Sequence, residues 1–541
     1  MKSMGYLINW PKYERFKAGD QWPAPTERTR NLPRPVFNII DLIESLKVST
    51  VMNEQIMMRF TSSDSGTDLA NEAADMFTKY SDTVWEEIQQ NDLNEQMLEI
   101  AANVGSGILH YYWDSGIKGG NVLKYEGKIC GEVLDPINVF FGNPQSREVQ
   151  SQPYILISYR ENTKKLRKEA TANKLSKTLI SMIGPDKNTA DEGYDMAQVE
   201  INDDDKTTAL LCYYRHDDGF IHFHKVASGM VIKPDTNSQM RKYPIALMPW
   251  KRRRKSIHGI GDTQGIIENQ KAINFMVAMA LLSGQLTGWP KMAIDPMRVD
   301  KRKITNTPGE IIDVKNAEKG LNTAVAYLNP GNISPHVMGL VDTVIDLTRS
   351  MTSANDASTG EAPGANMSAA ALIQLQRANG VPIESVKRRF YKCMEDVGRI
   401  WEEFFKVRYN LPREVKVKDD DGDDDFVQFD GSKYADTDLD LKIDIGPSSM
   451  FSEALMMSSL DRFLDQKFIT FDQYLKYAPN NVVPFKARLT REIESLREQQ
   501  ATQPTPMADP LASLSPEQRA QFDTLPPEQQ KAILQQAQQM G

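Results

Sequence analysis

The sequence predicts an α+β protein that is mainly helical, and three observations predict it. The region up to about residue 255 first shows apolar residues at helical spacing and then changes to the alternating pattern of β-strands. Two helix-like runs, 262–288 and 336–354, enclose an insert rich in Pro, Gly and β-branched residues. One helical pattern then continues for about forty residues, and further strands and short helices follow it.

Composition places the chain among soluble globular proteins. Hydrophobic residues make up 40% and charged residues 25% of its 541 residues, which is room for about two to four domains. The net charge of −9 excludes a strongly basic nucleic-acid binder of the repressor type. Cys130, Cys212 and Cys393 are far apart, so we expect no disulfide framework, no clustered zinc site and a reducing compartment. We expect no signal peptide and no membrane span, because no segment has the necessary apolar length.

Residues 1–35 are polar and rich in proline, with scattered aromatic side chains. This composition is typical of an extended N-terminal arm rather than of a domain. Trp10, Tyr13 and Trp22 could dock on a neighbouring molecule, and a disordered lead-in is the equally good alternative.

An α+β domain is predicted over residues 36–255. Helices are expected at 36–52, 68–89, 93–107 and 163–175, from apolar residues at helical spacing. Strands are expected at 108–113, 123–125, 129–134, 135–141, 154–159, 209–214 and 219–226, the last two forming a hairpin.

Residues 256–289 contain the predicted central helix, with Asp262 at the N-cap position and Gly288 at the end. From 272 to 282 the helix is apolar almost all round, so it must be buried on every side. A large core within one molecule would do this, and so would packing between copies of the chain. The candidate residues for packing between copies are Ile273, Val277, Ala280 and Leu281.

The rest of the chain divides by the same patterns. We expect a compact insert at 290–335, a second helix at 336–354, and a loop at 355–368 within a small polar stretch that begins at Ser353. A long helix follows at 369–410, with a kink at Pro382. Strands at 411–446, short helices at 447–500 and a Gln- and Pro-rich tail at 501–541 complete the chain.

Motifs for catalysis are missing from the sequence. It contains no GxxxxGK[ST], GxSxG, HExxH or CxxC, so we expect no enzyme, no cofactor and no metal. His222 and His224 lie two apart on a predicted strand and could offer two metal ligands, but no third ligand is evident. The acidic run 419–425 fails the EF-hand spacing and is typical of a solvated hairpin tip. A metal-dependent nuclease that uses Asp419, Asp421, Asp423 and Asp424 is the enzymatic alternative.

Three basic clusters could contact phosphate or an acidic partner. One is the run 251–255 before the central helix, and another is 387–389 on the long helix. The third lies in the insert and consists of Arg298, Lys301, Arg302 and Lys303. For the run 251–255, a solvated loop or ion pairs between subunits is the other explanation.

The order of these segments resembles that of tailed-bacteriophage portal proteins, the head-to-tail connectors. The resemblance covers about residues 36–497 and has four parts. They are VGSGILHYYWD followed by ICGEVLDPINVFFGNP, the start of the central helix at Gly259-Ile-Gly-Asp with Glu268, Asn269, Gln270 and Asn274, the segment GANMSAAALIQLQ, and the long helix that ends in VGRIWEEFF. Their order along the chain is more specific than any one of them.

The resemblance implies a ring, usually of about twelve subunits, at one vertex of the capsid. Each subunit would have a wing (36–255 and 411–446), two stem helices (256–289 and 336–354), a clip (290–335), a kinked helix and a helical crown (447–500). The ring would be the channel for packaging and ejecting double-stranded DNA, assembled in the host cytoplasm and retained in the virion. The implied partners are the terminase large subunit, the major capsid or scaffold protein and a head–tail adaptor, together with weak, non-specific contact to DNA.

Site residues follow from this resemblance. The loop 355–368 would project into the channel, and its candidate DNA-facing residues are Asn355, Asp356, Ser358, Thr359, Glu361, Asn366 and Ser368. The four clip cations would contact terminase or adaptor. A conduit must touch DNA without gripping it, and a loop without Lys or Arg suits weak contact. The alternative is another structural phage adaptor or scaffold-like protein without a DNA channel.

Overall fold

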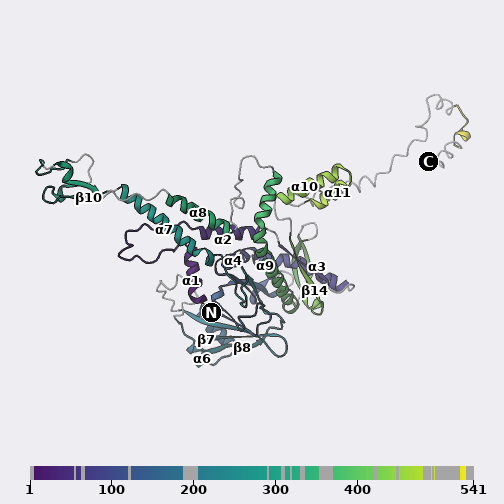
Figure 1. The fold of residues 1–541 in the computed structure, drawn as a ribbon. Coiled ribbons are helices and arrows are strands. Elements are labelled where there is room, and N and C mark those ends of the chain that lie inside the picture. Colours follow the sequence, from purple (N-terminus) through teal and green to yellow (C-terminus); the bar gives the residue numbers. More distant parts are fainter. Residues whose placement is uncertain are drawn as a thin grey trace. The chain divides into compact units, whose positions relative to one another are not determined.

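The computed structural model describes most of the chain. The described residues are 5–53, 56–62, 68–119, 124–186, 205–288, 291–305, 311–316, 318, 320–328, 336–352, 369–410, 412–418, 424–445, 450–478, 489, 493 and 524–531. They fall into two compact units, 1–448 and 449–541, which are described separately (Figure 1).

The main helices of the first unit are α1 (Tyr6–Lys17), α2 (Ile39–Met52), α3 (Asp68–Glu87), α4 (Gln90–Val104), α5 (Thr163–Ala172), α6 (Lys177–Met182), α7 (Thr263–Gly288), α8 (His336–Met351) and α9 (Ala369–Arg408). Short 3₁₀ helices lie at η2 (Pro136–Asn138), η4 (Lys301–Lys303), η6 (Leu321–Thr323) and η8 (Gly431–Tyr434). The region 36–255 is therefore α+β, as its alternating patterns predict.

Within the described residues, the strands form five antiparallel sheets. Their bounds are β1 (Ile56–Ser62), β2 (Ser106–Gly119), β3 (Tyr125–Leu134), β4 (Val139–Phe141), β5 (Tyr154–Asn162), β6 (Lys206–Arg215), β7 (Ile221–Ala227), β8 (Met230–Asn237), β9 (Ile245–Pro249), β10 (Lys291–Ile294), β11 (Val325–Leu328), β12 (Arg413–Lys418), β13 (Asp424–Phe429) and β14 (Leu439–Ile445). The sheet orders are β4-β5-β6-β7-β8, β3-β2-β9, β1-β14, β10-β11 and β12-β13.

The largest core is organised around the second half of α9. Phe390, Trp401 and Phe405 are at most 1% exposed and pack with side chains of α3, α4 and the β3-β2-β9 sheet. Phe405 contacts Phe77 of α3, with ring centroids 5.3 Å apart and an edge-on geometry that aromatic pairs favour. The apolar residues of α3 and α9 recur at helical spacing, which is why each helix buries one face.

The first and last strands of the first unit pair with each other. Ile56 of β1 lies opposite Ile445 of β14, and Ser62 lies opposite Leu439. One of the strands predicted after the long helix, β14, is therefore in the same sheet as β1, near the other end of this unit.

The N-terminal segment is not the extended arm that its composition predicts. Residues 6–17 form a helix, α1, and Trp10 and Tyr13 are 3% and 7% exposed. The two side chains belong to an apolar cluster of the same chain, and α1 contacts α2, α4 and α7. The prediction from composition was wrong because aromatic residues at helical spacing, rather than the prolines, determine the structure of this segment.

Helix α9 contains Pro382 within its bounds. The predicted kink at this residue remains a prediction. The described part of the second unit contains α10 (Met450–Asp465) and α11 (Phe471–Tyr477), as the periodicity predicts. Thr470 and Gln473 form a reciprocal capping box that fixes the start of α11. None of the described helices is both long enough and apolar enough to cross a membrane.

Candidate functional site

Asp262 anchors the start of α7 to the body. Its side chain is 1% exposed, and its carboxylate accepts hydrogen bonds from Lys47 Nζ at 2.6 Å, Lys251 Nζ at 2.5 Å and Trp250 Nε1 at 3.0 Å. Burial alone would raise the pKa of Asp262, but the two ammonium groups outweigh it and lower that pKa. Asp262 occupies the predicted N-cap position, but its carboxylate joins α2 and the end of β9 to the helix.

Three glycines make this junction tight. Gly105 ends α4 with a φ of +104°, and a Cβ added there would lie 2.7 Å from the backbone of Gly259. A Cβ on Gly261 would lie 2.0 Å from the carbonyl oxygen of Asn103. The Asp262 amide donates to the Ala102 carbonyl at 2.7 Å. The two glycine-containing motifs noted in the sequence therefore meet in space, backbone against backbone.

Glu44 is buried beside this junction. It is 0% exposed, accepts a hydrogen bond from the Thr263 hydroxyl, and lies 3.8 Å from Lys17 Nζ. Burial raises the pKa of Glu44 from 4.5 to about 7, although the Thr263 hydroxyl and Lys17 act to lower it.

Glu44→Gln is expected to change how stability depends on pH. The native state holds the Glu44 proton between pH 4.5 and 7 while the unfolded state releases it, so native stability falls as pH rises through this window. The loss is at most about 3 kcal/mol. In thermal unfolding, the stability of the variant minus that of the parent protein should therefore be greater at pH 8 than at pH 4.5. Exposed Glu95→Gln is the control, and a gain of the same size there would contradict the explanation.

Helices α7 and α8 lie side by side (Figure 1). Asn269 Nδ2 donates to Thr348 Oγ1 at 3.0 Å. Ile273 and Val277 of α7 pack in the same apolar cluster as Val341 of α8, together with α1 and α2. This face of α7 is therefore covered within the chain.

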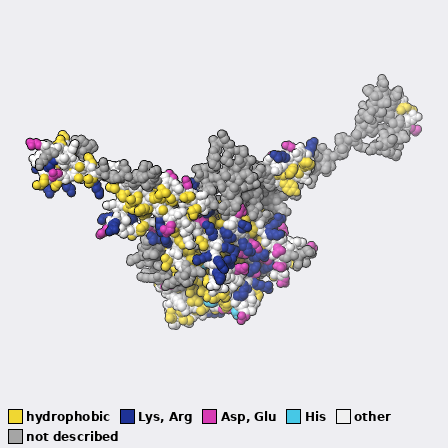
Figure 2. Space-filling model, in the orientation of Figure 1, with side chains coloured by type: hydrophobic (Ala, Val, Ile, Leu, Met, Phe, Trp, Pro, Cys, Tyr) yellow, Lys and Arg dark blue, Asp and Glu magenta, His cyan; other side chains and the backbone are white. Residues whose placement is uncertain are grey.

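A second face of α7 carries an uncovered apolar stripe, which we call the α7 stripe. Its members recur at alternating intervals of three and four residues, the spacing of a coiled-coil seam. They are Ala272, Phe275, Met279, Leu282 and Leu286. Phe275 is 54%, Met279 39% and Leu286 37% exposed. Figure 2 shows hydrophobic side chains gathered on the surface over this helix.

An open pocket of about 810 Å³ adjoins the beginning of the α7 stripe. Phe16 of α1, Trp22 and Phe275 contribute aromatic walls, and Lys12 and Glu268 lie among its polar lining residues. Pockets of this size whose lining surface is mainly apolar are typical binding sites for a side chain or a small ligand.

Helix α8 has an exposed apolar stripe of its own, the α8 stripe. Leu340, Leu347 and Met351 are 53%, 57% and 77% exposed. They recur after two helical turns and then one, so they lie along one side of the helix. The helix pair thus presents two separate apolar surfaces.

The four predicted packing residues of the central helix have different surroundings. Ile273 is 1% exposed, and Val277 and Ala280 are partly buried. Leu281 is 48% exposed. Only Leu281 of these four is largely uncovered, and the α7 stripe was not recognised from the sequence.

The described part of the insert contains the antiparallel pair of β10 and β11 and the buried side chain of Arg298. Arg298 is 7% exposed. Its guanidinium donates to Thr323 Oγ1 at 2.9 Å, to the Gly320 carbonyl at 3.0 Å, to the Asn316 carbonyl at 3.1 Å and to the Lys315 carbonyl at 3.3 Å. Arg298 therefore holds the insert together, whereas Lys301 and Arg302 are exposed on η4 with Lys303.

The predicted channel loop lies outside the described residues. This applies to Asn355, Asp356, Ser358, Thr359, Glu361, Asn366 and Ser368. Asp419, Asp421 and Asp423 of the acidic run lie outside the described residues as well, between β12 and β13.

Two basic clusters that are far apart in the sequence meet on one surface. Arg389 of α9 donates to the Trp250 carbonyl at 2.6 Å, next to the run 251–255. Burial, Arg252 and Arg388 together lower the pKa of Arg389, which indicates that these cations lie close to one another. Figure 2 shows Lys and Arg side chains gathered in the region of α9.

Comparison with known proteins agrees with the fold. The chain matches the family described as phage P22-like portal protein over residues 156–541. No curated protein matches it. The match covers most of the chain, including both helices of the pair, the insert and the long helix, and the portal family is structural rather than enzymatic. The chain belongs to the phage P22-like portal protein family.

Proposed function

We propose that the chain forms a closed ring at one capsid vertex, about twelve subunits in number, and that double-stranded DNA passes through the ring during packaging and ejection. The observation that carries the proposal is the pair of exposed apolar stripes on α7 and α8, in a chain of the portal family. Contiguous apolar surface of this kind marks a protein interface in soluble proteins.

The two stripes differ in composition, which favours a head-to-tail contact. The α7 stripe has Phe275 and an adjoining aromatic pocket, whereas the α8 stripe has only Leu340, Leu347 and Met351 as large apolar side chains. Self-association through one surface would give a symmetric dimer, whereas two different surfaces that fit each other can repeat around a ring. We therefore pair the α7 stripe of one copy with the α8 stripe of the next.

Contacts with other phage components follow by analogy with the family. The exposed cations Lys301 and Arg302 of the clip are proposed to bind the terminase large subunit or the head–tail adaptor. Arg298 is left out of this surface, because its guanidinium bonds within the clip. The loop 355–368 is proposed to face DNA, and the capsid or scaffold protein to contact the wing.

Mass measurement by light scattering, combined with negative-stain imaging of the purified protein, tests this function. We expect closed rings of about a dozen copies with a central hole. A protein that stays monomeric at high concentration and also with scaffold protein would contradict the ring and favour an adaptor without a channel.

Lys301→Ala with Arg302→Ala is expected to leave rings intact and to weaken terminase binding by about 10-fold or more, because rim charges contribute to partner attraction. The measurement is the affinity of purified terminase for rings immobilised on a surface, at two salt concentrations. Lys315→Ala removes another exposed cation of the insert and is the matched control. Equal losses in both variants would indicate a general charge effect rather than a docking site.

A further inference from the structure

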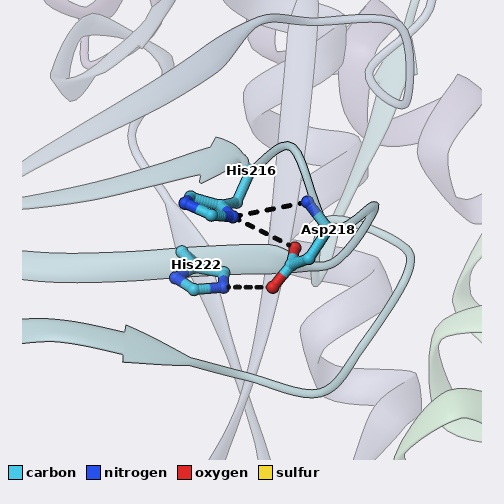
Figure 3. A group of neighbouring side chains, drawn as sticks. All are labelled: His216, Asp218 and His222. Carbon is cyan, nitrogen blue, oxygen red and sulfur yellow. Dashed lines mark hydrogen bonds and ion pairs between the residues drawn. The ribbon is translucent and has the colours of Figure 1, made fainter.

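The turn between β6 and β7 brings together two histidines and an aspartate (Figure 3). His216 and Asp218 lie in the turn, and His222 is the second residue of β7. One ligand atom from each of the three residues lies within 4.8 Å of those from the other two. The sequence had suggested His222 with His224, but His222 lies beside the turn residues instead.

Asp218 is the centre of the group. Its Oδ2 lies 3.0 Å from His222 Nε2, and its Oδ1 lies 3.4 Å from His216 Nδ1. The two imidazole rings stack with centroids 4.4 Å apart and an interplanar angle of 19°. Figure 3 shows a nitrogen of each ring directed toward Asp218. Two nitrogens and a carboxylate oxygen therefore face one small volume.

Asp235 of β8 orients His222 from behind. Its Oδ2 lies 2.8 Å from His222 Nδ1, and its Oδ1 accepts a hydrogen bond from the Tyr214 hydroxyl at 2.8 Å. A carboxylate on the far nitrogen of a histidine is the arrangement that fixes a metal ligand, since it keeps the proton on Nδ1 and leaves Nε2 for the ion. His224 has no such partner in this group and lies beside Tyr214, with ring centroids 5.9 Å apart.

The charges also favour a cation. Asp218 and Asp235 both face His222, with carboxylate oxygens 3.0 Å from its Nε2 and 2.8 Å from its Nδ1, respectively. Two carboxylates beside the imidazole make the site electronegative, which favours binding of a cation. A metal ion at this position can bind His222 and His216 together.

We propose that His216, Asp218 and His222 bind a divalent transition-metal ion of the zinc class at the β6–β7 turn. Two imidazoles and one carboxylate are ligands that suit Zn²⁺ and Co²⁺, and the remaining positions are open to water. The ion would join the turn to β8 through Asp235 and through Asn237, whose Nδ2 donates to Asp218 Oδ2 at 3.2 Å. This departs from the expectation, drawn from the sequence, of no metal.

The test uses the full chain, freed of metal with a chelator, and titration with Zn²⁺ by calorimetry and with Co²⁺ by absorption spectroscopy. We expect about one saturable ion per chain and cobalt bands that indicate nitrogen ligands. His222→Ala and Asp218→Asn should each weaken binding by about 100-fold or more, and Asp235→Asn by about 10- to 100-fold.

His224→Ala is the matched control, because it removes a histidine of the same strand outside the group. It should leave affinity and stoichiometry unchanged. Saturable binding that survives in His222→Ala would overturn the proposal, and so would a parent protein that binds no ion. Circular dichroism of each variant distinguishes loss of the site from loss of the fold.

Discussion

Phe275→Glu is expected to abolish ring formation and to leave a folded single subunit. Phe275 is the largest exposed side chain of the α7 stripe and also forms a wall of the adjoining pocket. Buried aromatic anchors of protein interfaces typically cost about 2–4 kcal/mol when truncated, and a charge in the same place adds its own desolvation cost. In the proposed ring every subunit makes this contact, so the loss is repeated at every interface.

The measurement for Phe275→Glu is mass in solution by light scattering across a range of concentrations. Because Phe275 is 54% exposed in the single chain, the substitution should leave the thermal unfolding midpoint of the subunit nearly unchanged. Gln285→Glu introduces the same carboxylate on α7 at an exposed, polar position outside the stripe and is the matched control. Rings of unchanged mass in Phe275→Glu would exclude the α7 stripe as the subunit contact.

Asp262→Ala is expected to destabilise the body of the subunit by about 3–5 kcal/mol. The side chain of Lys47 is 7% exposed and loses its carboxylate partner, so a buried charge remains without compensation. Trp250 Nε1 loses its acceptor in the same variant, which adds to the cost of burial.

Thermal unfolding together with amide exchange in α7 measures the effect of Asp262→Ala. The midpoint should fall by several degrees, and exchange at the start of α7 should become faster. Glu268→Gln breaks the exposed pair with Lys271, which lies 2.6 Å away, and should leave the midpoint nearly unchanged because surface ion pairs contribute little. A double variant, Lys47→Met with Asp262→Leu, should recover part of the loss, because it removes both charges together.

Local patterns predict much of the fold. The helices at 68–89 and 163–175 and the central helix agree with α3, α5 and α7 within a few residues at each end. These segments have apolar residues at helical spacing, and the central helix has a clear end signal at Gly288, so short-range information is sufficient.

Long-range contacts explain what the sequence does not predict. Strand β1 was not recognised, because its pairing partner β14 lies almost at the other end of the first unit. Strand β9 was missed for the same reason, since its neighbour in the sheet is β2. Helix α1 was not predicted, because the surrounding sequence is rich in proline. Its aromatic face packs against α2 and α7, which are distant in the sequence.

The candidate surfaces show the same limit. Apolar residues of α7 could be recognised, but a helix that is apolar nearly all round does not indicate which side its own chain covers. The structure places Ile273 against α8 and leaves Phe275 uncovered, two residues away. The group that we propose to bind metal was not predicted from the sequence. The residue that orients His222 is Asp235, which lies on another strand.

The pairing of β1 with β14 has a consequence for biosynthesis. The ribosome completes α7 and α8 well before it makes residues 439–445, which close the sheet that begins at Ile56. Contacts of such large sequence separation form slowly. During translation the two apolar stripes therefore emerge on a subunit whose body is still open at one edge. In the proposed ring, closure is accordingly expected only after residues 439–445 have been made, and until then both stripes are exposed on the nascent chain.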